Sequence, residues 1–261
     1  MLVDSHCHLD HFAEPERSAV VARARAAGVA EMVTIATTLA ASAALRAIAA
    51  EQQVWVTVGV HPHHAGEYWN EAGEGPSPES IAAETAYPRV VGIGESGLDY
   101  FYDTSPRPAQ QAGFRAHIRA ARLAGVPLAI HARDADADVA AILRDEWDRG
   151  GPFAFLLHCF SSSRGLAEAA LALGGLISFS GILTFPRSEE LRAIARDVPA
   201  ERLLVETDSP YLAPVPLRGK RCEPAFVVHT AAKLAELRAL SPAALADLTT
   251  ANFRRLFTRA A

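Results

Sequence analysis

Short apolar runs recur along this chain, and six of them end in a histidine or an acidic residue. An apolar run of this kind indicates a buried strand. Two further runs, at 32–35 and 176–179, have the same composition without a polar residue at the end. The six runs with polar ends lie at 2–6, 54–63, 90–95, 128–131, 153–158 and 203–208. The pattern therefore predicts eight strands.

Alanine-rich segments separate these strands and are predicted to be helices. Some of them stop at a glycine, such as Gly28 and Gly125, which is a common helix C-terminal signal. Ser241 and Pro242 suit an N-cap and a first helical position, so a terminal helix pair is expected to start there. The segment 67–80, rich in Gly, Glu and Pro, is expected to be a surface loop. The predicted helices lie at 15–27, 38–51, 106–124, 134–148, 163–173 and 188–197.

The alternation of strands and helices predicts the fold class. Strands that alternate with helices form a parallel sheet, and eight such units predict closure into a barrel. The C-terminal ends of barrel strands meet at one mouth, where the polar residues of several strands can form a site. We therefore expect an α/β fold: a (β/α)8 TIM-type barrel, one domain over 1–261, with a metal site at the C-terminal mouth.

Composition agrees with this expectation. Of the 261 residues, 50% are hydrophobic and 21% are charged, which is ordinary for a globular protein with one large core. The length also admits two small domains. No apolar run is long enough for a bilayer, and we expect no cleaved signal peptide. The three cysteines suit neither a disulfide framework nor a Cys-x-x-Cys zinc site. We expect a cytoplasmic monomer that does not bind membranes.

Six polar residues form a set of metal-ligand types. His6 and His8 point to the same face of a strand, about 7 Å apart, with Asp4 one step deeper on that face. Two such imidazoles can bind one ion. Mixed nitrogen and oxygen ligands suit zinc, manganese, iron or nickel better than calcium, and magnesium is a further candidate for the expected divalent ions. The complete predicted set is His6, His8, Glu95, His131, His158 and Asp208.

Six ligands exceed the needs of one open catalytic ion. Two divalent ions about 3.5–4 Å apart would use them all if one carboxylate bridged them. Glu95 is the expected bridge, with His6, His8 and Asp208 around one ion and His131 and His158 around the other. Gly94 and Gly97 flank Glu95 and are expected to leave the site open.

The expected chemistry is metal-assisted hydrolysis. A dication lowers the pKa of a bound water towards neutrality. Asp208 is expected to accept the proton as general base, and Glu95 is the second expected catalytic residue. Glu206 is two residues before Asp208 on the same face, where it could support the ligands.

Seven sequence blocks follow one another over nearly the whole chain. They are DSHCHLD at 4–10, GVHPH at 59–63, GESGLDY at 94–100, IHARDA at 130–135, LHCFS at 157–161, ETDSPYL at 206–212 and RGKRCEP at 218–224. Together they resemble the motifs of the TatD family of metal-dependent deoxyribonucleases. The resemblance implies a (β/α)8-type barrel of the amidohydrolase superfamily, a divalent-metal site and phosphodiester hydrolysis, with DNA as the partner. Ser162 and Cys222 depart from the family pattern, and both are expected at the rim of the mouth.

Cations near the expected mouth favour an anionic substrate. The net charge of −5 gives no general affinity for nucleic acid, so the local distribution matters more. His61 and His63 share a face of the third strand, where imidazolium groups could hold a phosphate oxygen. The predicted substrate-binding set is His63, Arg133, Arg218, Lys220 and Arg221.

Two further groups near the ligands have open roles. The aromatic run 100–102 could stack on a base, or it could pack within its own loop. Cys7 and Cys159 adjoin expected ligands, but alternation along a strand should turn their side chains to the opposite face, where they would pack.

The same residues admit other functions. A fold does not determine a substrate, so hydrolysis of an amide, a lactone or an aminoacyl ester on RNA remains open, as does RNA in place of DNA. The fourth strand ends in Glu95 rather than in a lysine that could be carbamylated, which favours the nuclease. A non-catalytic metal-binding or nucleic-acid-binding protein is the least favoured, because binding alone needs no open site with a base.

Overall fold

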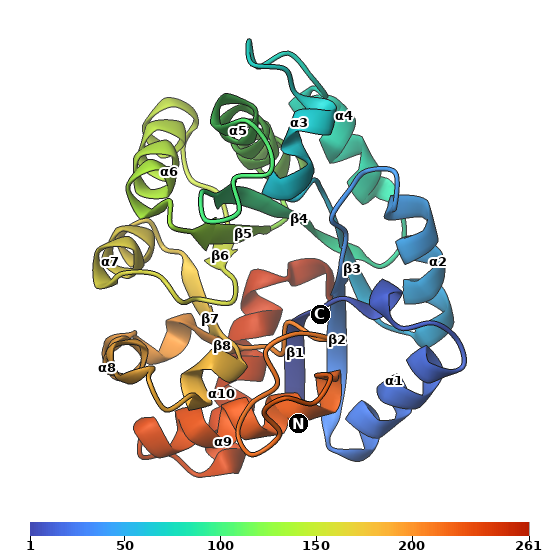
Figure 1. Ribbon diagram of the computed structural model, residues 1–261, viewed down its shortest axis with the longest axis vertical. Helices are drawn as coiled ribbons and strands as arrows, with labels where there is room; N and C mark the ends of the chain where they lie inside the picture. Colours follow the sequence, from blue (N-terminus) through green and yellow to red (C-terminus); the bar gives the residue numbers. More distant parts are fainter. Residues whose placement is uncertain (261) are drawn as a thin grey trace.

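Eight parallel strands form one sheet in the order of the sequence, and helices surround it (Figure 1). The structure is a computed structural model and describes residues 1–260. The strands are β1 (Leu2–Cys7), β2 (Val29–Ile35), β3 (Trp55–Val58), β4 (Val90–Asp99), β5 (Leu128–Arg133), β6 (Phe155–Leu157), β7 (Leu176–Phe179) and β8 (Leu203–Val205). This architecture confirms the predicted (β/α)8 barrel.

The first and last strands meet at their C-terminal ends and close the barrel. Cys7 and Ser209 form an isolated parallel bridge, and the N–H of His8 donates to the Ser209 carbonyl at 2.8 Å. The N–H of Asp208 donates to the carbonyl of His6 at 2.9 Å. Barrel closure therefore places Asp208 beside His6, in β1, and His8, directly after it, although about 200 residues of sequence separate them.

The helices follow the predicted order with small shifts at their ends. Gly125 ends α5 with a left-handed φ of 64°, a conformation in which glycine has no steric penalty. Within residues 1–260, no helix is both long and apolar enough to cross a bilayer. The helices are α1 (Glu16–Ala26), α2 (Ser42–Gln52), α3 (Ala65–Tyr68), α4 (Pro78–Ala83), α5 (Arg107–Ala124), α6 (Asp136–Gly150), α7 (Arg164–Ala172), α8 (Glu189–Asp197), α9 (Val227–Leu237) and α10 (Pro242–Leu256).

Two sequence expectations about these segments need correction. Ser241 caps α10, since its hydroxyl accepts the N–H of Ala244 at 3.1 Å, but α10 is the second member of the terminal pair and α9 precedes it. The segment 67–80 is not a loop throughout, because α3 ends inside it and α4 begins inside it. Pro78, at the start of α4, supplies a backbone angle already suited to a first helical turn.

The end of the barrel opposite the polar mouth is filled by apolar side chains. Val3, Val91 and Leu204, near the starts of their strands, belong to one buried cluster with Phe253 and Phe257. The two phenylalanine rings stack at a centroid distance of 4.7 Å. The C-terminal helix α10 and the turn after it therefore close this end, and polar groups are left to gather at the other.

A candidate metal centre at the barrel mouth

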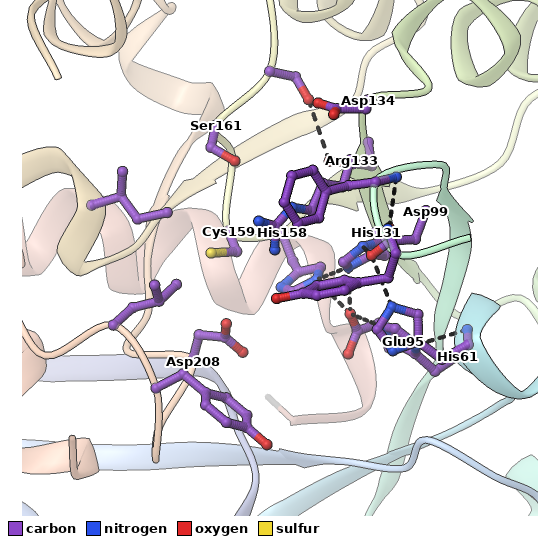
Figure 2. Close-up of a pocket in the computed structure, with 18 of the residues that line it drawn as sticks. His61, Glu95, Asp99, His131, Arg133, Asp134, His158, Cys159, Ser161 and Asp208 are labelled. Carbon is purple, nitrogen blue, oxygen red and sulfur yellow. Dashed lines mark hydrogen bonds and ion pairs between the residues drawn. The ribbon is translucent and has the colours of Figure 1, made fainter. Parts of the chain in front are cut away.

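A cavity of about 1220 Å³ opens where the strands end. Five of the six predicted metal ligands line it, and His6, which is fully buried, lies just beneath. Figure 2 shows Asp208 on one side of the cavity and His61 on the other, with His158 and Glu95 between them. The sequence-predicted ligand set is thus brought together in space.

The two oxygens of Glu95 face two different groups of histidines. Oε2 lies 3.4 Å from Nε2 of His6 and 3.9 Å from Nε2 of His8. Oε1 lies 2.7 Å from Nε2 of His158 and 3.0 Å from Nδ1 of His131. One carboxylate therefore stands between two sets of nitrogen donors, which is the arrangement that a bridging ligand needs.

The sequence suggested that Glu95 ends its strand, but in the structure Glu95 lies within the strand. β4 continues for four more residues to Asp99, and Gly97 is needed for this course. A Cβ at Gly97, whose φ is 149°, would lie 1.9 Å from the carbonyl oxygen of His131. Glycine is therefore required at position 97 because β4 and β5 approach each other closely. The sequence had instead suggested that this glycine keeps the site open.

Asp208 reaches the cavity from an uncommon backbone conformation. Its φ is 58°, in the left-handed region that aspartate tolerates better than most other residues. Its Oδ1 lies 3.4 Å from Nε2 of His8 and 3.7 Å from Nε2 of His6. Such conformations persist where the surroundings impose them, often at functional sites.

Asp4 holds the residue that precedes Asp208. Its Oδ1 accepts the N–H of Thr207 at 2.8 Å, and its Oδ2 accepts the Thr207 hydroxyl at 2.6 Å. Burial raises the pKa of Asp4 to about 8, although both hydrogen bonds from Thr207 oppose this rise. Asp4 is one step deeper than the candidate ligands, as its position on the strand predicted, and it positions the segment that follows β8.

The donor atoms fall into three groups whose members lie within 4.8 Å of one another. Both ring nitrogens of His6 and Nδ1 of His8 are buried and have no hydrogen-bond partner in the part of the chain that the structure describes. Buried polar groups normally have partners, and a metal ion would supply one. The donor set therefore fits divalent metal. The groups are His6–His8–Asp208, His6–Glu95–His158 and His61–Glu95–His131.

Two buried carboxylates orient two of the candidate ligand histidines. Asp99 Oδ2 lies 3.0 Å from Nε2 of His131, and Glu206 Oε1 lies 3.3 Å from Nδ1 of His158. Because a carboxylate accepts, each of these nitrogens is the N–H donor. The opposite nitrogen of each ring is then free to face Glu95, as in carboxylate–histidine–metal arrangements. Glu206 was expected to support the ligands, whereas Asp99, four residues after Glu95 on the same strand, was not among the predicted site residues.

His61 is a hydrogen-bond donor towards Glu95 rather than a cation. The N–H of His63 donates to His61 Nδ1 at 3.1 Å, so the proton of the neutral ring is on Nε2, which lies 3.3 Å from Glu95 Oε1. Burial lowers the pKa of His61 to about 4 despite the nearby Glu95 carboxylate. The expected imidazolium is therefore not present at this position near neutral pH.

Glu95 and Asp208 are held in their charged forms. Burial alone would raise the pKa of Glu95, but the surrounding imidazoles, His158 first, hold it well below its ordinary value. Burial would also raise the pKa of Asp208, but the hydrogen bond with His8 and the nearby imidazoles of His6, His158 and His8 together lower it. Both carboxylates are therefore anionic near neutral pH and suited to hold cations.

The predicted substrate-binding residues separate into two sets. His63 and Arg133 line the cavity, whereas Arg218, Lys220 and Arg221 are not part of its lining. Arg221 Nη1 pairs with Glu16 Oε2 at 2.9 Å, and Arg218 packs over the Phe185 ring at 3.6 Å. His61 and His63 do not share a strand face, because β3 ends at Val58. They lie at a short 3-10 helix, Pro62–His64.

The cysteines and Ser162 differ in part from expectation. Cys7 is buried in the core, as predicted, but Cys159 lines the cavity. It follows the last residue of β6 by two and has a φ of 42°, so strand alternation does not apply there. Ser162 lines the cavity as expected, whereas Cys222 is fully buried and not at the rim.

Comparisons with known proteins agree with this geometry. Residues 3–258 match the family model described as TatD related DNase. The chain is 44% identical to the uncharacterized metal-dependent hydrolase YcfH of Escherichia coli, over 98% of this chain and 95% of that protein. It is 37% identical to the 3'-5' ssDNA/RNA exonuclease TatD of Rahnella sp., over 95% and 94% respectively. The crystal structure of the TatD homolog YjjV from Escherichia coli superposes with a TM-score of 0.85 at 28% identity, covering 98% of each chain.

Proposed function

The chain belongs to the family of TatD related DNases and is a metal-dependent hydrolase, and from this premise we propose that it is an exonuclease that cleaves DNA. A 37% identical relative bears the name of a 3'-5' exonuclease on single-stranded DNA and RNA, which supports phosphodiesters as the substrate class. The open cavity of about 1220 Å³ accommodates a nucleotide unit. All three cysteines are free, which is compatible with a cytoplasmic enzyme.

The position of Glu95 is the observation that carries the proposal of two ions. Its Oε2 faces His6 and His8, and its Oε1 faces His131 and His158, so each oxygen is available to a separate ion. Asp208 completes the first group. Divalent ions held there, such as zinc, manganese, magnesium, iron or nickel, would activate a water molecule and offset charge on the leaving oxygen.

The remaining steps fall to side chains of the chain itself. Asp208 is anionic and lies at the edge of the cavity, so it accepts the proton of the attacking water as general base. His61 directs its single N–H at Glu95 and so helps to keep that carboxylate in place. Asp99 and Glu206 keep His131 and His158 in fixed orientations, which limits the reorganisation required during the reaction.

An assay with the metal-depleted and the reconstituted protein tests this function. Each divalent metal is added in turn, and end-labelled single-stranded and duplex oligonucleotides are incubated beside a carboxylic ester and an amide. We expect stepwise shortening of single strands that depends on added metal. Turnover of the ester or the amide without any cleavage of the oligonucleotides would contradict the proposal.

A further inference from the structure

Exposed aromatic side chains gather at the mouth of the barrel. Phe101 and Tyr102 are each 55% exposed, although large aromatic side chains are more often buried. Both line the cavity, and their rings meet edge to face at a centroid distance of 4.9 Å. They therefore leave much of their surface open towards the space above the metal centre rather than packing into the protein.

Arg133 joins these two rings. Its guanidinium carbon lies 4.1 Å from the centre of the Phe101 ring and 4.8 Å from that of Tyr102. No carboxylate among residues 1–260 lies within ion-pair distance of it. Stacking against aromatic faces leaves guanidinium N–H groups available for an anion. We call Phe101, Tyr102 and Arg133 the aromatic rim.

A single buried carboxylate ties the aromatic rim to the metal centre. Asp99 Oδ1 accepts the backbone N–H groups of Phe101 at 3.1 Å and of Tyr102 at 2.9 Å. Its Oδ2 lies 3.0 Å from Nε2 of His131 and 2.9 Å from Nε2 of His63. The rim is therefore held at a fixed distance from the ligands, as a surface that positions one part of a substrate must be.

We propose that the aromatic rim binds the unpaired nucleobase that adjoins the scissile phosphate. Flat aromatic faces and a guanidinium stack on any base, and Arg133 can at the same time contact the next phosphate. A base within a duplex is covered by its neighbours and cannot reach the rim without unstacking, so the rim favours single strands. This inference rests on the proposed function, which it extends by assigning residues to base binding.

The test compares two oligonucleotides that differ only at the nucleotide next to the scissile bond, which carries a base in one and is abasic in the other. For the wild-type protein we expect the abasic substrate to raise KM by roughly 5- to 150-fold, the effect of one stacked base. The variant F101A/Y102A should show the same KM for both substrates. Phe101→Tyr and Tyr102→Phe, which keep the rings, should retain the preference for the base.

Tyr87→Ala is the matched control, because Tyr87 is also exposed, at 50%, and packs on Arg46 away from the cavity. If F101A/Y102A lowers the melting temperature, F101L/Y102L takes its place in the test, because leucine preserves apolar volume without an aromatic ring. Equal KM values for both oligonucleotides in the wild-type protein would overturn the inference. An equal rise in KM for the two oligonucleotides in the variants without rings would overturn it as well. If the wild-type protein cleaves neither oligonucleotide but hydrolyses an ester or an amide, the proposed function itself has failed.

Discussion

His158 donates a hydrogen bond from Nδ1 to Glu206 Oε1 at 3.3 Å, and its Nε2 therefore points to Glu95 Oε1 at 2.7 Å. The same Glu206 oxygen accepts the backbone N–H of Cys159 at 2.7 Å. Glu206 is fully buried, so both hydrogen bonds form without competition from solvent. This carboxylate therefore determines which nitrogen of His158 is available to a metal ion.

Replacing Glu206 with Gln should weaken metal binding by about 10- to 100-fold while the fold is retained, because the orientation of His158 would no longer be fixed. Calorimetric titration of the metal-depleted protein measures this affinity. Glu190→Gln is the control, since Glu190 lines the same cavity at its rim. An affinity equal to that of the wild-type protein would show that Glu206 does not position His158.

Glu95→Gln should reduce both the bound metal and the turnover, because a neutral amide cannot hold two dications together. Elemental analysis of the purified protein gives the metal content, and circular dichroism reports the fold. Near-normal turnover with full metal content would show that the two-ion arrangement is wrong.

Asp208→Asn should lower kcat by about 10²–10⁴, the effect of losing a positioned proton acceptor, and should lower metal occupancy much less. Rates and metal content are measured on the same sample. Parallel losses in both quantities would make Asp208 a ligand and nothing more.

Arg133→Gln should flatten the dependence of single-strand binding on salt, because Arg133 lines the cavity without a carboxylate partner among residues 1–260. The slope of log affinity against log salt should change by about 0.7, which corresponds to one phosphate contact. Arg221→Gln is a matched comparison: Arg221 already pairs with Glu16 and should affect the slope less. A larger change for Arg221 would place the phosphates on the opposite side of the mouth.

His117 should make the stability of the protein depend on pH. Its Nε2 accepts the N–H of Val60 at 2.9 Å and its Nδ1 donates to the Gly113 carbonyl at 2.7 Å, and burial lowers its pKa to about 4. The unfolded chain, with an ordinary pKa of about 6.5, then binds more protons than the folded one between these values. Stability is therefore lost as pH falls from about 6.5 to 4, on the order of 3 kcal/mol in total.

Urea unfolding of the wild-type protein and of His117→Gln at several pH values measures this contribution. The pH dependence of all other groups is shared, so the difference between the two proteins isolates His117. The difference should shrink as pH falls through this window, and a constant difference would contradict the assignment.

The barrel, and the gathering of the six candidate ligands at its mouth, could be predicted because each rests on a local pattern. An apolar run followed by a histidine or a carboxylate marks both a strand and a residue at the mouth. The role of Asp99 could not be predicted in this way, because nothing in the apolar pattern indicates that β4 continues past Glu95. Its continuation depends on contact with β5, where only glycine fits at position 97. The pairing of Arg221 with Glu16 is likewise a contact between distant segments, and local patterns do not contain it.

The meeting of β1 with β8 has a consequence for how the protein is made. The strand pairing between β1 and the segment after β8 is limited to one bridge, Cys7–Ser209, while every other pair of neighbouring strands shares a ladder. An ion held by His6, His8 and Asp208 would cross-link the chain at this junction. The ribosome produces the two histidines first and Asp208 only after four fifths of the chain has been synthesised. Metal capture would therefore coincide with the end of assembly, and incomplete chains would be left without the complete centre.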